Sequence, residues 1–207
     1  GSDSNSALPW TNPDRHRFDY GPSGFDHTHR LVASYVWNLP ALGKQNGFIR
    51  QALGSWEFTG IGTMQSGGPF TVTAGKDQSL TGLGQDRGVP VAGVNPSLSG
   101  VCTTGKCVNY LNPAAFALPA TGTYGTLSKD SFRGPDLIDW DMGFFKNFPI
   151  TERIKLQARA EFFNAFNRTN FNNPSSSISS SSFGEITGTV GGTGDARIGQ
   201  MAVKLFF

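Results

Sequence analysis

The sequence predicts an all-β protein, in which antiparallel β-strands form a partial transmembrane β-barrel with long extracellular loops. Three observations predict this fold class. Five segments alternate between apolar and polar residues with a period of two, which is typical of half-buried strands. Each segment is about ten residues long, the length that a tilted transmembrane strand needs. The connections between them alternate between shorter and much longer ones, as in outer-membrane barrels.

The composition agrees with strands and turns. Charged residues make up 15% of the 207 residues, whereas soluble globular domains usually contain about 25%. Glycine (27 residues) and phenylalanine (17 residues) are both frequent. No apolar run reaches the roughly 18 residues of a transmembrane helix, but barrel strands alternate and average out in hydropathy. The net charge of +2 is small and spread along the chain, so we expect no nucleic-acid partner.

The first two strands are expected at about residues 30–39 and 55–66, after a polar, turn-rich loop over residues 1–28. Pro40 ends the first strand, because proline cannot donate to a β-ladder. In the second strand two glycines share a face with large apolar side chains. The apolar positions of the two segments are Leu31, Ala33, Tyr35, Trp37, Leu39, Trp56, Phe58 and Met64.

The other three strands are expected at about residues 137–148, 153–166 and 197–207. The clearest alternation begins at Arg153, where apolar Ile154, Leu156 and Ala158 are separated by polar residues. A helix is the alternative there, since Leu, Ala, Gln and Glu favour helices. A period of 3.6 residues would leave no apolar stripe on such a helix, and this favours the strand.

The long connections, residues 67–136 and 167–196, are rich in Gly, Pro, Ser, Thr and Asn. Structureless loops of this length argue against a compact soluble domain. Outer-membrane barrels have short periplasmic turns and long extracellular loops, so we expect residues 40–54 and 149–152 on the periplasmic side. An aromatic girdle then lies near the periplasmic rim, formed by Trp37, Trp56, Phe58, Phe144, Phe148 and Phe207.

Five charged residues on the third and fourth strands are expected to face the lumen: Asp139, Asp141, Lys155, Arg159 and Glu161. Lys155 and Arg159 would form cross-strand ion pairs with the two aspartates. Paired carboxylates can also serve acid–base catalysis. No nucleophile motif or other catalytic constellation accompanies them, so we expect no catalytic residues and no enzyme.

Cys102 and Cys107 lie in the segment VCTTGKC. This spacing in a loop favours a small disulfide in an oxidising compartment, and two free thiols are the alternative. His27 and His29, in DHTHR, lie close enough to share a metal ion, but no third ligand is apparent. We therefore expect solvated loop histidines, no metal site and no cofactor.

Three segments resemble one family. Residues 134–174 have the sequence GPDLIDWDMGFFKNFPITERIKLQARAEFFNAFNRTNFNNP, which resembles the barrel end of TonB-dependent outer-membrane receptors of the Oar-like group. Those receptors carry a carboxypeptidase-regulatory-like domain ahead of a plug and a barrel. Residues 24–40 (GFDHTHRLVASYVWNLP) and residues 110–126 (YLNPAAFALPATGTYGT) resemble the same group. The resemblance therefore spans most of the chain from about residue 20, with several short matches in the same order.

The last strand looks like the C-terminal signal that outer-membrane proteins present to the barrel-assembly machinery. Its matching positions are Met201, Val203, Leu205 and Phe207.

The resemblance implies the C-terminal barrel segment of a transporter in the outer membrane of a Gram-negative-type bacterium. Its implied partners are the lipid bilayer, the barrel-assembly machinery and TonB, the last through a plug region absent from this chain. The implied substrate is a siderophore, carbohydrate or peptide. Such barrels have about 22 strands, and we expect this chain to supply about five of them. The alternative is a secreted soluble β-rich binding or fibre-forming structural module, with strands exchanged between subunits.

Overall fold

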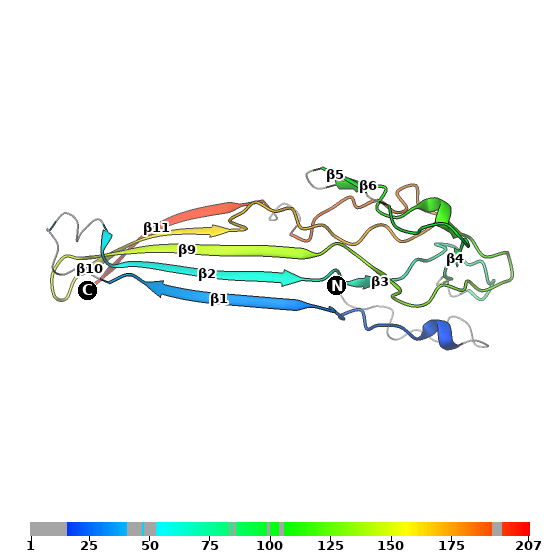
Figure 1. Cartoon of the computed structure of the whole chain (residues 1–207), viewed down its shortest axis with the longest axis horizontal. Coiled ribbons are helices and arrows are strands. Elements are labelled where there is room, and N and C mark those ends of the chain that lie inside the picture. Colours follow the sequence, from blue (N-terminus) through cyan, green and yellow to red (C-terminus); the bar gives the residue numbers. More distant parts are fainter. Residues whose placement is uncertain are drawn as a thin grey trace. The chain divides into compact units, whose positions relative to one another are not determined.

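The computed structural model describes residues 16–40, 47, 53–82, 84, 86–98, 100–103, 106–191 and 196–207, of which residues 16, 18, 101–103 and 106–108 are described by their backbone alone. The chain divides into two compact units (Figure 1). The sheet unit comprises residues 29–65, 137–170 and 191–207. The loop unit comprises residues 1–28, 66–136 and 171–190. In the described part of the chain, no helix is long and apolar enough to cross a membrane.

Five long strands form the sheet unit, and they lie side by side in Figure 1. Their order is β1-β2-β9-β10-β11, and every pair of neighbours is antiparallel. This arrangement confirms the predicted fold class and all five predicted strands. The bounds are β1 (Arg30–Asn38), β2 (Trp56–Gln65), β9 (Leu137–Pro149), β10 (Lys155–Phe163) and β11 (Ile198–Phe206).

The register aligns the alternation of all five strands. Tyr35 lies opposite Gly60, Gly60 opposite Met142, and Met142 opposite Phe162, which in turn lies opposite Gly199. Directly opposite residues share a face, so a single apolar face extends across the sheet. We call this set the apolar face: Leu31, Ala33, Tyr35, Trp37, Trp56, Phe58, Gly60, Gly62, Met64, Ile138, Trp140, Met142, Phe144, Lys146, Phe148, Leu156, Ala158, Ala160, Phe162, Gly199, Met201, Val203 and Leu205.

Aromatic rings connect the strands on the apolar face. The ring of Phe58 lies 5.9 Å from that of Trp37 and 5.4 Å from that of Phe144, which is 6.0 Å from Phe162. Such spacings are typical of favourable aromatic pairs. The rings also cover glycines, since a Cβ on Gly62 would lie 2.7 Å from the Trp140 ring. Four of the six residues of the predicted aromatic girdle, Trp37, Trp56, Phe58 and Phe144, therefore form a connected set of rings on this face.

The predicted fourth strand is too long at both ends. β10 begins at Lys155, because Ile150 and Thr151 donate backbone hydrogen bonds to the Ile154 carbonyl and close a tight turn. It ends at Phe163, because Asn164 adopts a φ of +46°. Asparagine tolerates this left-handed conformation better than most residues. The Asn164 side chain then accepts from the Arg168 N–H at 2.9 Å and donates to the Arg168 carbonyl at 2.8 Å.

The two long connections are not structureless, which corrects the sequence-based expectation. Together with residues before β1 they form the loop unit, which has a hydrophobic core of its own. Val72, Leu111 and Ile186 are its largest fully buried side chains, and they come from widely separated parts of the connections. The core cluster comprises Phe70, Val72, Leu111, Ala115, Phe116, Leu127 and Phe183. The core residues are spaced irregularly along the sequence, so no apolar period predicts this core.

Short ladders hold this core together. Thr73 bridges both Arg87 and Ser177, and the Gly184 carbonyl accepts from the N–H groups of Tyr110 and Leu111 at 2.9 and 3.1 Å. The remaining elements of the unit are η1 (His16–Asp19), β3 (Pro69–Phe70), β4 (Val89–Pro90), β5 (Val101–Thr103), β6 (Lys106–Val108), η2 (Pro113–Ala115), β7 (Phe116–Ala117) and β8 (Phe132–Arg133).

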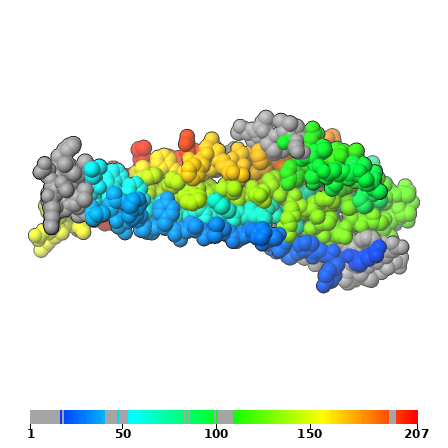
Figure 2. Space-filling model, viewed as in Figure 1, coloured from blue at the N-terminus to red at the C-terminus, as the bar shows by residue number. Residues whose placement is uncertain are grey.

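The outer strands of the sheet remain open. Within the described chain, β1 pairs with β2 alone and β11 pairs with β10 alone. Figure 2 shows β1 (blue) uncovered along its length, and its Trp37 is 64% exposed. On β11, Met201 is 84% exposed. The five strands therefore form an open sheet with two unpaired edges and not a closed barrel.

The glycine positions under aromatic rings provide a test of the packing on the apolar face. We expect Gly62→Ala to destabilise the folded protein by about 1–3 kcal/mol, since the new Cβ forces the Trp140 ring to move. Gly199→Ala is the matched control on the same face, because its Cβ would meet the Phe162 ring at 3.4 Å, an ordinary contact. Urea unfolding of the protein in phospholipid vesicles measures both effects. Equal unfolding midpoints for the two variants would contradict the packing described.

Candidate functional site

The second face of the sheet carries its charged side chains, with the exception of Lys146. All five residues predicted to face the lumen lie on it: Asp139, Asp141, Lys155, Arg159 and Glu161. The register joins them to polar residues of neighbouring strands, since Asp139 lies opposite Thr63 and Glu161 opposite Gln200. We call this the polar face. The sequence thus assigned these residues correctly to one face; that the face lines a lumen stays a prediction.

The predicted cross-strand ion pairs are wrong. Lys155 lies opposite Pro149, and Arg159 lies opposite Phe145. Asp141 precedes Phe145 by four residues on β9, and it is therefore farther from the turn than the partners of both basic residues. Side chains on paired strands contact the residue opposite or one diagonal neighbour, two positions away. The tight turn after β9 sets this register, and it keeps the two basic residues nearer the turn than the two acids.

Three of these charged residues, Glu161, Arg159 and Asp141, contact neutral groups. Glu161 accepts a hydrogen bond from the Gln200 amide at 2.6 Å, across the β10–β11 pair. Arg159 donates from Nε to the Gln157 side chain at 2.6 Å, and its guanidinium lies 5.3 Å from the centre of the Phe145 ring. Asp141 accepts from the Asn164 N–H at 3.0 Å. These contacts hold the side chains in place while leaving their charges on the polar face.

A hollow of about 340 Å³ lies over the middle of this face. Gly143 is one of its lining residues, and a Cβ there would approach the Thr59 hydroxyl to 2.5 Å. Seven of the lining residues direct their side chains to the polar face: Ser34, Val36, Thr59, Ile61, Asp141, Glu161 and Phe163. The hollow therefore combines hydroxyls, two carboxylates and apolar groups, which suits contact with a polar or cationic group of a solute.

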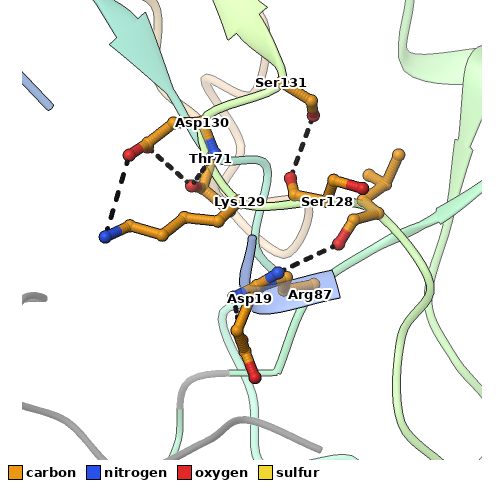
Figure 3. Close-up of polar contacts among 8 residues, drawn as sticks. Asp19, Thr71, Arg87, Ser128, Lys129, Asp130 and Ser131 are labelled. Carbon is orange, nitrogen blue, oxygen red and sulfur yellow. Dashed lines mark hydrogen bonds and ion pairs between the residues drawn. The ribbon is translucent and has the colours of Figure 1, made fainter. Parts of the chain in front are cut away.

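The loop unit is held together by a buried ion pair, drawn in Figure 3. The Arg87 guanidinium donates to the Asp19 carboxylate, and 7% of the Arg87 side chain is exposed. A second guanidinium nitrogen donates to the Leu127 carbonyl at 3.3 Å. Burial lowers the pKa of Arg87, and the charges of Asp19 and Asp130 oppose that effect. Arg87 thereby links three segments that are distant in the sequence.

Other polar contacts fix the loops of the same unit. Thr71 donates its hydroxyl to Asp130 at 2.9 Å and accepts from the Asp130 N–H at 2.8 Å (Figure 3). The carboxylate of Asp77 accepts from the Gly82 N–H at 2.7 Å, and this bond is the largest cause of its lowered pKa. Burial, aided by the charge of Asp136, raises the pKa of Tyr110. Hydrogen bonds and ion pairs thus supplement the apolar core.

The predicted disulfide cysteines and His27, which was considered and rejected as a metal ligand, lie in this unit. β5 pairs with β6 so that Cys102 is directly opposite Cys107. Their side chains lie outside the described residues, and the disulfide stays a prediction. His27 donates from Nδ1 to the Ser66 carbonyl at 2.9 Å. Among the described residues there is no group of three or more potential metal ligands.

A family model described as "Outer membrane beta barrel domain" matches residues 1–200. This chain belongs to that family. No curated protein and no solved structure matches the chain significantly. The outer-membrane localisation predicted from the sequence is confirmed by the family. The alternative of a secreted soluble module does not fit it.

Two important features of the barrel domain escaped the sequence interpretation. Lys146 lies on the apolar face, where the flanking Phe144 and Phe148 obscured the break in alternation. The sequence signal for Lys146 was the presence of a lysine at an apolar position of the alternation. Asp19 and Arg87 are 68 residues apart, and no local pattern connects them. Pairing of this kind becomes visible only when the loops are folded.

The buried ion pair gives a test of the loop unit. We expect Asp19→Ala to cost about 3–5 kcal/mol, because it removes the carboxylate from a buried guanidinium. Lys129→Ala is the matched control in the same unit: its ammonium lies 4.0 Å from the Asp130 carboxylate, and its side chain is more exposed (24%) than that of Arg87 (7%). Such a long ion pair contributes about 0–1 kcal/mol. Protease cleavage within residues 66–136 on intact cells reports the opening of the unit. Equal protection of both variants would argue against a stabilising role for the pair.

Proposed function

We propose that the barrel domain forms part of the wall of a TonB-dependent outer-membrane transporter and that it is not an enzyme. The observation that carries this proposal is the open sheet with one apolar and one polar face. In a lipid bilayer every backbone N–H and C=O must be paired, so both outer strands need further partners. Five strands cannot close a barrel, and 22-stranded outer-membrane transporters have a plugged lumen.

The family resemblance supports this class of transporter. Residues 134–174, which contain β9 and β10, resemble the barrel end of TonB-dependent receptors of the Oar-like group. By that resemblance, a plug region outside this chain contacts TonB, and the barrel-assembly machinery inserts the strands. The substrate class is a siderophore, carbohydrate or peptide.

Recognition in this proposal belongs to the polar face and the loop unit. The hollow that includes Asp141 and Glu161 offers carboxylates and hydroxyls to a passing solute. Loops held in one conformation lose less entropy on binding than flexible ones, and the loop unit has its own core. No residue carries a chemical step.

A genetic experiment tests TonB-dependent transport. Deletion of the gene and deletion of tonB should each abolish uptake of the same compound, and the double deletion should be no worse than either single one. The compounds to compare are ferric siderophores, oligosaccharides and peptides, each isotopically labelled. Loss of uptake in the gene deletion alone, with full uptake in the tonB deletion, would contradict TonB dependence while leaving a passive barrel.

A second experiment tests the disulfide. Opposite Cα atoms in an antiparallel pair lie about 4.5–5.5 Å apart, within the roughly 4.4–6.8 Å range that a disulfide spans. We expect Cys102 and Cys107 to resist alkylation in the unfolded protein until a reductant is added. Cys102→Ser is the control, since it should leave one thiol that reacts at once. Mass spectrometry counts the alkyl groups, and labelling of the wild type without reductant would mean free thiols.

A further inference from the structure

The hollow on the polar face has a one-sided charge. Two carboxylates, Asp141 and Glu161, line it, and among its described lining residues there is no lysine, arginine or histidine. Glu161 lies opposite Gly143, and Asp141 precedes Gly143 by two residues on β9. The two carboxylates are therefore diagonal neighbours on one face, a relation that corresponds to about 7–8 Å between the side chains. Two negative charges that face the same space repel each other, and a cation placed between them is stabilised by both.

No basic side chain nearby neutralises these two charges. The next residue of the polar face on β10, Arg159, donates from Nε to Gln157, which lies nearer the turn and farther from the hollow. Neither Asp141 nor Glu161 takes part in an ion pair within the described chain. One oxygen of each carboxylate accepts a hydrogen bond from a neutral donor, and the second oxygen accepts none from a described residue. Both carboxylates therefore keep an acceptor for a ligand.

The other side chains of the hollow add hydroxyl and apolar groups. Ser34 and Thr59 line it with hydroxyl oxygens, which accept hydrogen bonds from a cation or an amide. Val36, Ile61 and Phe163 are 66%, 53% and 43% exposed, so their apolar groups are accessible to a solute. The volume of about 340 Å³ lies near the lower end of the range for ligand pockets, about 300–1,000 Å³. A basic side chain, with its apolar stem and terminal cation, matches this lining in size and chemistry.

Other solutes match the lining less well. Both carboxylates would repel an anionic siderophore, and a neutral oligosaccharide would leave their mutual repulsion in place. A bare metal ion is also a poor occupant. Ca²⁺ takes about six to eight oxygen ligands, whereas the described residues contain no group of three or more potential metal ligands.

We propose that the hollow binds a lysine or arginine side chain of a peptide, and that the transported solute is a cationic peptide. Asp141 and Glu161 accept hydrogen bonds from the ammonium or guanidinium group, and charge-assisted bonds of this kind are the strong ones. Val36 and Phe163 contact the apolar stem. The inference rests on the proposed function, because it requires the polar face to line the transport route, and it selects one of the three substrate classes.

Binding of a short basic peptide tests this assignment. The full-length protein is purified from the outer membrane in detergent, and fluorescence polarisation measures its affinity for labelled trilysine. Unlabelled trilysine should displace the probe, whereas triglutamate and maltotriose should not. Asp141→Asn and Glu161→Gln should each weaken trilysine binding by about ten-fold, the effect of losing a hydrogen bond to a charged group. Both substitutions retain the oxygen that accepts from the protein, so we expect both variants to fold.

Asp139→Asn is the matched control, since Asp139 lies on the same face of β9 but outside the lining of the hollow. It should bind trilysine with the affinity of the wild type. Unchanged affinity in both Asp141→Asn and Glu161→Gln would overturn the inference, as would equal displacement of the probe by triglutamate or maltotriose. The measurement does not involve TonB. Failure of trilysine to bind therefore contradicts this inference alone, whereas uptake that is independent of TonB contradicts the proposed function.

Discussion

The register between β9 and β10 is the constraint on which both faces of the sheet depend. Thr151 accepts hydrogen bonds from the N–H groups of Arg153 and Ile154, and these bonds hold the turn that aligns the two strands. A shift by one residue would exchange the faces, because successive side chains point in opposite directions. Arg159 would then face lipid, at a cost of about 2–4 kcal/mol near the bilayer midplane. The correct register instead puts Phe144 beside Phe162 and Glu161 beside Gln200.

The loop unit solves a different problem. Ordering a residue costs about 1–2 kcal/mol in backbone entropy, so long connections stay flexible unless they bury enough apolar surface. Here segments from three parts of the chain contribute Val72, Leu111 and Phe183 to one core. The ring of Phe116 contacts those of Phe132 and Phe183, both at 5.4 Å. The connections therefore stabilise one another, and no single loop would keep this conformation alone.

Features of the fold that depend on neighbouring residues in the sequence were predictable, whereas those that depend on contacts between distant residues were not. The five strands follow from period-two alternation, and their predicted bounds agree closely except at the ends of β10, where the left-handed Asn164 ends the strand. The alternation of side chains along each strand was enough to assign five charged residues to one face, and this assignment was correct: Asp139, Asp141, Lys155, Arg159 and Glu161. Their partners were wrong, because partners depend on the turn that sets the register. The loop core was missed because its members are far apart and follow no period.

The two units consequently draw their stability from different surroundings. In the loop unit, Val72 and Ile186 are fully shielded from solvent by the protein itself. In the sheet unit, Leu31, Val203 and Met201 remain more than half exposed, and such a continuous apolar surface is far from typical of a protein in water. In a lipid bilayer hydrocarbon would cover such a face, and the backbone groups along the edges of β1 and β11 would need hydrogen-bonding partners. Changes of lipid or detergent should therefore act first on the sheet, whereas substitutions in the loop core act through packing within the chain. The same sequence thus combines a surface matched to hydrocarbon with a small core of the kind found in soluble proteins.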